Sequence, residues 1–153
     1  MVVSDTSPIN YLILTEYVGV LHELYGQIVL PGKVLEELSS ARAPGIVSTW
    51  CSALPDWVHV KVPTRTDSGL KLGAGEREAI LLAEEIGANL LLIDERTGRR
   101  EAMLRNLLVT GTLGILRAAA ERGLVDGEEV IKRLTETSFR TSPKLLRLMI
   151  SKG

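Results

Sequence analysis

Short apolar runs alternate along the chain with segments of helical periodicity. The run from 90 to 93 is continuously apolar, as expected for a strand covered on both faces of a sheet. Residues 57–62 instead alternate with a period of two and are rich in β-forming side chains, which favours a strand at an edge of the sheet. Together with the shorter apolar runs, the pattern predicts five strands, over residues 2–5, 28–30, 57–62, 90–93 and 107–109.

Helices are expected between and after these strands, and some of them have clear end signals. Ser7 is placed to cap a helix that has Pro8 at its first position, and Gly87 is placed to end the helix before the fourth strand. Thr112 is interpreted as the cap of a later helix, in preference to a phosphate-binding turn at residues 110–114. Helical patterns cover residues 8–14, 18–24, 45–53, 75–86, 99–105, 113–122, 127–136 and 143–150, and a further helix opened by Pro31 carries Glu36 and Glu37.

This alternation predicts an α/β fold: a mainly parallel, twisted sheet of roughly five strands with helices on both faces. The last three helices follow one another without a strand and are expected to form one flank. The chain of 153 residues is 45% hydrophobic, which is typical of a globular protein. No linker, repeat or low-complexity tract divides it, so a single domain over residues 1–153 is expected.

Two features bear on the compartment. No apolar run reaches the roughly 20 residues that a membrane-spanning helix needs, and the first residues lack the pattern of a signal peptide. A cytoplasmic protein that does not bind membranes is therefore expected. Cys51 is the only cysteine, which excludes an internal disulfide and a thiolate-rich zinc site.

The net charge of −1 conceals two halves of opposite sign. Residues 1–95 carry 6 Lys and Arg against 13 Asp and Glu, giving −7, whereas residues 96–153 carry 12 against 6, giving +6. Lys and Arg supply most contacts to nucleic-acid phosphates. An acidic part joined to a basic part would suit an enzyme that cleaves nucleic acid, although solvated helix faces would also explain most of the basic residues.

Four acidic residues mark the candidate chemistry. Asp5 and Asp94 each follow an expected buried strand, and parallel α/β folds bind ligands beyond the carboxyl ends of their strands. Glu37 and Glu76 fall on helices, where solvation or a favourable position at a helix N-terminus would explain them without a function. Because hard divalent cations prefer oxygen ligands, the four carboxylates together suggest a metal site.

The order and flanks of these acids resemble the PIN-domain family of metal-dependent nucleases, which includes toxins of prokaryotic toxin–antitoxin pairs. The family's opening Asp-Thr-Ser stands here at residues 5–7, and its second acid resembles Glu37 in the segment 31–38. Its third and fourth acids resemble Glu76 and Asp94, which lie 18 positions apart. Glu76 stands where Asp is commoner in the toxins, which places the chain in a less characterised branch. Similarity extends to residues 93–99 and 109–114, and so covers nearly the whole chain.

The resemblance implies four catalytic acids, Asp5, Glu37, Glu76 and Asp94. Of these, Asp5, Glu76 and Asp94 would bind Mg²⁺ or Mn²⁺, and Glu37 would hold or orient a water. Two alternatives stay open: Glu36 replaces Glu37 if the helix register differs by one residue, and Glu95 serves as a substitute ligand. The resemblance also implies a PIN-like three-layer α/β/α sandwich.

The same resemblance implies a substrate and partners. RNA is the expected substrate, with Thr6 or Ser7 bonding the site or the scissile phosphate and Arg96 and Arg99 contacting the strand. DNA is an open alternative. An antitoxin protein and a homodimer are expected as partners, since dimers are the commonest oligomers and the amphipathic helices offer apolar surface.

Two other functions compete with the nuclease. A catalytically silent PIN-like module could use its apolar helices to bind a protein. A phosphohydrolase could use the strand-end Asp5 as a nucleophile, but hydrolases of that kind want a second Asp two positions on, where this chain has Ser7.

Overall fold

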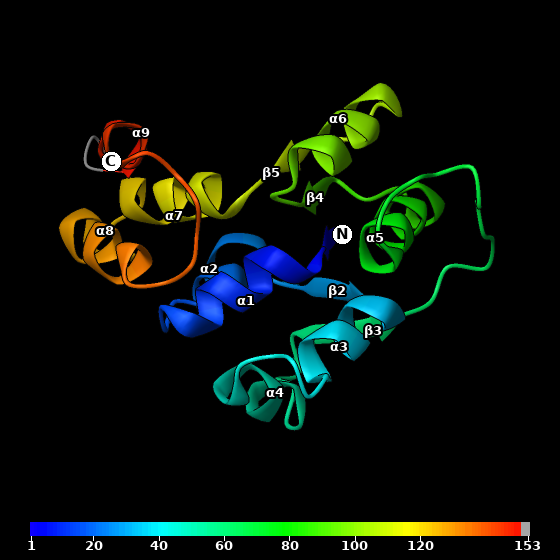
Figure 1. The fold of residues 1–153 in the computed structure, drawn as a ribbon, viewed down its shortest axis with the longest axis horizontal. Helices are drawn as coiled ribbons and strands as arrows, with labels where there is room; N and C mark the ends of the chain where they lie inside the picture. Colours follow the sequence, from blue (N-terminus) through cyan, green and yellow to red (C-terminus); the bar gives the residue numbers. More distant parts are fainter. Residues whose placement is uncertain (151–153) are drawn as a thin grey trace.

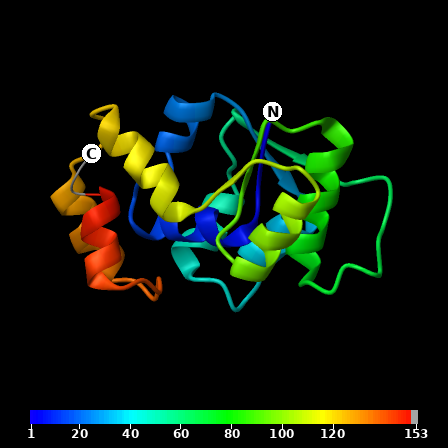
Figure 2. The ribbon, with the colours of Figure 1, turned by 90° about the horizontal axis from the view of Figure 1, so that it is seen from above.

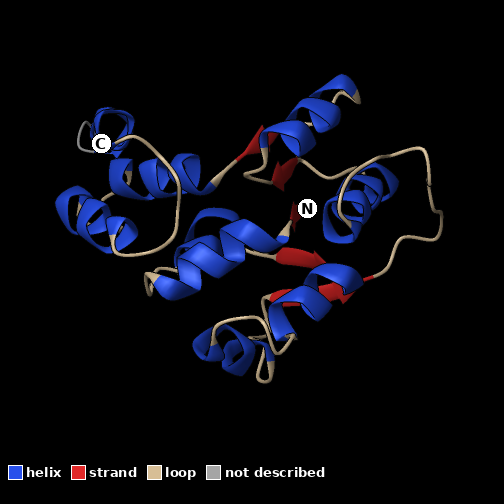
Figure 3. Ribbon diagram, viewed as in Figure 1, coloured by secondary structure: helices blue, strands red, loops and turns tan. Residues whose placement is uncertain are grey.

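The computed structural model of the protein describes residues 1–150 and contains a five-stranded sheet in which every strand is parallel to its neighbours. The strand order is β3-β2-β1-β4-β5, so β1 lies at the centre and β3 at an edge, as the alternating pattern predicted. The strands, shown as red arrows in Figure 3, are β1 (Val2–Ser4), β2 (Ile28–Pro31), β3 (Val58–Lys61), β4 (Leu90–Leu92) and β5 (Val109–Thr110).

Nine helices lie within residues 1–150, each within a few residues of its predicted range. Gly87 ends α5 in the left-handed conformation that favours glycine, with φ of 62°. α6 differs most from prediction, because it begins at Arg96 rather than near Arg99. The helices are α1 (Thr6–Leu14), α2 (Val20–Tyr25), α3 (Gly32–Ser39), α4 (Gly45–Cys51), α5 (Ala74–Ile86), α6 (Arg96–Leu104), α7 (Thr112–Glu121), α8 (Gly127–Thr135) and α9 (Pro143–Ile150).

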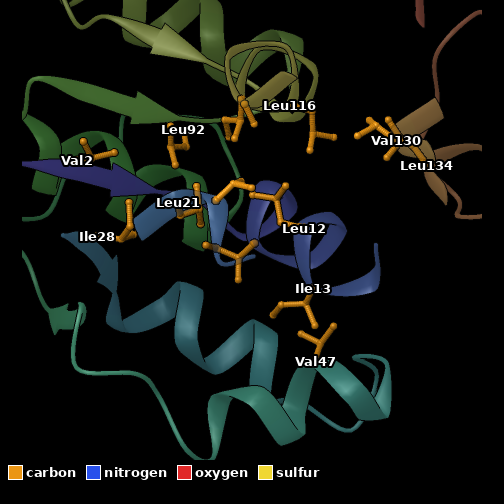
Figure 4. Packing of buried hydrophobic residues seen from close by; sticks show 14 of the residues in the cluster. Val2, Leu12, Ile13, Leu21, Ile28, Val47, Leu92, Leu116, Val130 and Leu134 are labelled. Atoms are coloured by element: carbon orange, nitrogen blue, oxygen red, sulfur yellow. The ribbon is translucent and has the colours of Figure 1, made fainter. Parts of the chain in front are cut away.

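The sheet is covered on both faces, because successive side chains of a strand point to opposite sides. Val2 belongs to a core cluster shared with α1, α2 and α7, whereas Val3 belongs to a second cluster shared with α5 and α6. Figure 4 shows the first cluster, in which Val2 and Leu92 of the sheet face Leu21 and Leu116 of the helices. Each fully buried aliphatic side chain contributes roughly 1.5–3 kcal/mol. The predicted three-layer α/β/α sandwich is confirmed.

The last three helices gather on one flank of the molecule, as expected from the absence of strands between them (Figure 1). α9 packs against α7 and α8, and Leu146 and Ile150 of α9 are buried in the same cluster as Val130 and Leu134 of α8. The segment between α8 and α9 passes beside α1, where Phe139 meets Tyr11. This flank therefore brings residues far along the chain next to the first helix.

A long segment, residues 62–73, arches outward between β3 and α5 (Figure 2). Arg105 helps to attach this segment to the body, because it pairs with Asp67 at 3.1 Å and with Glu84 of α5 at 2.9 Å. Thr64 and Arg65 of the segment also bond to α5, at Glu85 and Glu84. The hydrogen bond that Arg105 donates to Asp67, with a second from the Gly69 backbone N–H, holds the pKa of the Asp67 carboxyl below its usual value. None of the helices in residues 1–150 combines the length and the apolar composition that crossing a bilayer requires.

Candidate active site

The carboxyl ends of β1 and β4 lie side by side, because these strands are parallel neighbours at the centre of the sheet. Ser4 is in register with Leu92, and the Asp5 backbone N–H donates a hydrogen bond of 2.8 Å to the Leu92 carbonyl. Asp5 and Asp94 therefore follow adjacent strand ends, which is the placement that the sequence predicted for them.

Asp5 is almost completely buried, with 4% of its surface exposed, and its Oδ1 atom has no hydrogen-bond partner. Burial raises the pKa of this carboxyl to about 7, against a lowering contribution from the Thr6 backbone N–H. The negative charges of Glu76, Glu37 and Asp94 are smaller contributions to the same rise. All four predicted acids thus lie close enough to influence one charge.

Asp94 is fixed by three donors. Its Oδ1 accepts from the Thr112 backbone N–H at 2.6 Å, and its Oδ2 accepts from the hydroxyls of Thr112 and Ser7 at 2.7 and 2.8 Å. The carboxylate lies at the N-terminus of α7, where the helix dipole favours a negative charge. Gly111 allows this approach, since a Cβ there would lie only 2.5 Å from Asp94 Oδ1. Charge-assisted bonds of this kind hold a side chain in one orientation.

The caps predicted for α1 and α7 are wrong, and Asp94 is the reason. α1 begins at Thr6, not at Pro8, and Asp5 occupies the N-cap position without a side-chain capping bond. α7 begins at Thr112, and its N-cap is Gly111. The hydroxyls of Ser7 and Thr112 cap no helix because both donate to the Asp94 carboxylate.

Glu76 uses its two oxygens differently. Oε1 accepts from the Gly73 backbone N–H at 3.2 Å, which caps α5, whereas Oε2 is buried without a partner. Burial raises the pKa of Glu76, the bond to Gly73 lowers it, and the charges of Glu95 and Glu37 raise it again. A Cβ at Gly98 of α6 would lie 2.9 Å from Glu76 Oε2, so α6 packs close over this atom. Glu76 therefore points inward, toward the other acids.

The structure separates Glu37 from Glu36. Glu37 accepts a hydrogen bond of 2.6 Å from the Thr6 hydroxyl, and its carboxylate lies against Gly75, where a Cβ would come within 2.6 Å of Oε1. Glu36 points away and pairs with Lys33 at 3.2 Å, on a surface where both side chains are largely exposed. Of the two candidates for the second acid, Glu37 lies beside the others.

The side chains fit a hard divalent cation in their chemistry, but they are not preassembled around one. All the available donors are carboxylate and hydroxyl oxygens, the ligands that Mg²⁺ and Mn²⁺ prefer. Two carboxylate oxygens, Asp5 Oδ1 and Glu76 Oε2, are buried and unsatisfied, and an unpaired buried carboxylate oxygen is costly without a cation or a donor. Within residues 1–150, however, no three or more His, Cys, Asp or Glu side chains are arranged as a ligand set.

A cleft of about 1200 Å³ opens beside Asp94, between the start of α6 and the segment that leads into α9. Arg96 and Arg99, predicted to contact substrate, both line it, and Arg99 is oriented by a hydrogen bond of 3.3 Å from Nη1 to the Ile93 carbonyl. Ser7 also lines the cleft, whereas Thr6 faces Glu37. The predicted substrate residues are thus divided between the acidic cluster and the cleft.

Several lining residues were missed by the sequence reasoning. They are Tyr11, Arg100, Phe139 and Arg140. The positive charge of the second half of the chain was a signal for the two arginines, but it did not distinguish one arginine from another. No signal in the sequence indicated the two aromatic residues.

A parallel sheet between two helical layers, with four acids near the carboxyl ends of its central strands, defines an α/β protein with an acidic candidate active site. A family model described as a PIN domain, DUF3368, matches residues 1–153. The chain therefore belongs to the PIN-domain family, which confirms the resemblance seen in the sequence. PIN domains are generally nucleases and typically use divalent metals. No curated protein and no solved structure matches the chain.

Proposed function

We propose that the protein is a metal-dependent endoribonuclease that hydrolyses phosphodiester bonds with Mg²⁺ or Mn²⁺ held by carboxylates. One observation carries the proposal: Asp5 Oδ1 and Glu76 Oε2 are buried without partners in a cluster of four acids, beside an arginine-lined cleft. The cluster alone would repel itself, and the cleft alone would attract any polyanion. Their adjacency is what a phosphodiester-cleaving centre requires.

Asp5, Glu76 and Asp94 are the proposed metal ligands. When bound, the ion supplies a water that ionises near neutral pH and positive charge beside the attacked phosphate. Ser7 and Thr112 keep the Asp94 carboxylate turned toward the site through the hydrogen bonds described above. Burial keeps Asp5 away from bulk water, so its charge is stabilised by a cation rather than by solvent.

Glu37 is the proposed acceptor for the attacking water. One of its oxygens is oriented by the Thr6 hydroxyl, which leaves the other oxygen able to accept a proton or hold the water. Arg96 and Arg99 are the proposed contacts to the substrate backbone, since both line the cleft next to Asp94. The cytoplasm is the proposed site of action, because RNA is available there.

The test is cleavage of labelled RNA and DNA by purified protein in EDTA, Mg²⁺ and Mn²⁺. Asp5→Asn and Asp94→Asn are expected to abolish metal-dependent cleavage of RNA. Glu36→Gln serves as the matched control, because Glu36 is exposed and pairs with Lys33 on the surface, so the activity of this variant should be unchanged. Cleavage that survives in both Asn variants would show that a contaminant is responsible and would refute the assignment. Cleavage of DNA but not of RNA would show that the substrate is DNA rather than the proposed RNA.

A protein partner, either an antitoxin or a second copy of the chain, is proposed as well. Exposed apolar side chains at the end of α6 and before β5 support it: Leu104 is 72% exposed and Leu108 is 71% exposed. Such side chains on neighbouring segments mark protein contacts. Sedimentation of the purified protein, compared with that of Leu104→Glu and Leu108→Glu, tests the homodimer. If all three proteins sediment as monomers, the homodimer is refuted. A protein that binds a partner and never cleaves RNA would be the silent interaction module.

A further inference from the structure

The cleft beside Asp94 has an aromatic wall as well as a basic one. The rings of Tyr11 and Phe139 lie 5.1 Å apart between centroids at an interplanar angle of 54°, and both residues line the cleft. The Tyr11 hydroxyl forms a hydrogen bond of 3.0 Å with Ser138, which fixes the segment carrying Phe139 against α1. Both residues are only partly buried, so part of this aromatic surface faces the cleft.

The arginines of the cleft differ from those elsewhere in the basic half of the chain. Arg105, Arg117 and Arg133 are engaged in ion pairs with glutamates, at 2.9 to 3.5 Å for the closest atoms of each. Among the residues that the structure describes, no carboxylate lies within ion-pair distance of the cleft arginines. This group consists of Arg96, Arg99, Arg100 and Arg140. Their charge is available to an anionic ligand.

We propose that this cleft binds an unpaired nucleotide of the substrate strand, with the base stacked on Phe139 and the flanking phosphates at Arg100 and Arg140. The inference rests on the proposed nuclease function and names the form of RNA that the site selects. A base can stack on a side chain only when it is unpaired, whereas phosphates are accessible in both duplexes and single strands. Phe139 therefore favours a substrate strand that is unpaired at this one nucleotide.

Nucleic acid fits this cleft better than an acidic protein segment does. Asp94 and Glu95 line the cleft beside the arginines. A strand whose scissile phosphate lies at the acidic cluster continues into the cleft without a break, because Asp94 belongs to both. Stacking on an aromatic ring also places a flat group where Phe139 and Tyr11 form the wall.

The experiment measures binding apart from cleavage. Asp5→Asn protein in EDTA is mixed with a single-stranded RNA that carries 2-aminopurine, whose fluorescence falls when the base stacks. We expect quenching on binding, and loss of most of that quenching in Asp5→Asn/Phe139→Leu with affinity weaker by about 5- to 100-fold. Asp5→Asn/Phe139→Trp should retain both. Asp5→Asn/Arg117→Ala is the matched control, since Arg117 lies outside the cleft and pairs with Glu121.

Changes in the RNA give the same test without altering the protein. An abasic site in place of the stacked nucleotide should weaken RNA binding to Asp5→Asn. It should have little further effect on binding to Asp5→Asn/Phe139→Leu. Full pairing of the RNA strand should have the same effects on the two proteins. Equal quenching and affinity in the Leu and Trp variants would overturn the proposal, as would equal affinity for paired and unpaired RNA. Binding of an acidic peptide that RNA cannot displace would do so too.

The failure of this inference is distinct from the failure of the proposed function. If wild-type protein cleaves RNA with Mg²⁺ or Mn²⁺ while Phe139→Leu leaves the preference for single strands unchanged, only the stacking site is refuted. If the stacking signal appears but no metal supports cleavage, the cleft binds RNA and the hydrolytic function is refuted.

Discussion

The hydroxyl of Thr6 donates a hydrogen bond of 2.6 Å to Glu37, joining the first residue of α1 to a carboxylate on α3. This bond turns Glu37 toward the buried acids, while its neighbour Glu36 faces solvent. Thr6→Val, which keeps the shape of the side chain but removes the donor, should lower the turnover of RNA cleavage by about 10-fold or more. Thr6→Ser should restore most of it. Single-turnover kinetics is the measurement. If Thr6→Val cleaves RNA at an unchanged rate, the proposed role of Glu37 is refuted.

Gly75 provides a second test of the position of Glu37. A Cβ at this glycine would lie 2.6 Å from Glu37 Oε1, so the carboxylate must move in Gly75→Ala. The end of a glutamate moves easily and alanine favours a helix, so the free energy of unfolding should change by less than about 1 kcal/mol. Activity should fall by up to about 100-fold because the group is displaced.

Gly45→Ala is the matched control for that change, because no atom lies within 4 Å of the added Cβ. It should leave activity unchanged. Chemical denaturation and RNA cleavage would be measured on both variants. A Gly75→Ala protein that is fully active would contradict the placement of Glu37 in the site.

The raised pKa of Asp5 predicts how stability depends on pH. Burial, opposed by a bond from the Thr6 backbone and reinforced by neighbouring acids, raises this pKa from 3.8 to about 7. The folded protein then binds a proton more tightly than the unfolded chain, so the contribution of Asp5 is present at low pH and is lost as pH rises from about 4 to 7. The loss amounts to at most about 4 kcal/mol.

Asp5→Asn removes that titration. The free energy of unfolding of the variant, measured by urea denaturation across this range without metal, should exceed that of the wild type increasingly as pH rises to 7. Titrating groups that do not interact with Asp5 contribute equally to both proteins, so their effects cancel in the difference. A difference that does not vary with pH would show that Asp5 titrates normally.

Divalent metal should raise the melting temperature of the wild-type protein. An ion that binds the folded state alone stabilises it by mass action, and here it also relieves repulsion among the four acids. Mg²⁺ or Mn²⁺ at saturating concentration should therefore shift Tm upward at pH 8 by several degrees, and the shift should nearly vanish in Glu76→Gln. Differential scanning calorimetry with Ca²⁺-free buffers measures it. No response to either metal would count against the carboxylate site.

Thr112 should contribute to stability through Asp94. Its side chain is fully buried, and its hydroxyl and backbone N–H both donate to the carboxylate. Thr112→Val removes a charge-assisted hydrogen bond and should lower the free energy of unfolding by about 1.5–3 kcal/mol, whereas Thr112→Ser should cost less. Thr135→Val, at an exposed hydroxyl that bonds only to a backbone carbonyl, should cost less than about 0.5 kcal/mol.

The sheet and the two aspartates could be predicted from the sequence, and the reason is geometric. Continuous apolar runs such as 90–93 identify central parallel strands, and the ends of such strands meet at one edge of a sheet. Asp5 and Asp94 follow directly from that rule. The apolar pattern of the helix does not distinguish Glu37 from Glu36, because the two acids are adjacent beside the same apolar face. Only the hydrogen bond from Thr6, which lies on another helix, separates them.

The helix caps and the aromatic wall could not be predicted, since each depends on a tertiary contact. Ser7 and Thr112 carry ordinary capping signals, but a charged acceptor reached from another strand competes for both hydroxyls. Phe139 meets Tyr11 across 128 positions of the sequence, and nothing near either residue indicates that meeting. Local patterns report helices and strands, whereas these contacts depend on how the elements pack.

The order of the site along the chain has a consequence during translation. Asp5 is made first, but two of the three donors that fix Asp94 belong to Thr112, and the aromatic wall of the cleft is complete only with Phe139. A ribosome must therefore have released nearly the whole sheet and its final flank before these parts can meet. An unfinished chain carries its acids without the contacts that orient them, so the proposed ribonuclease would be inactive while its own messenger is being translated.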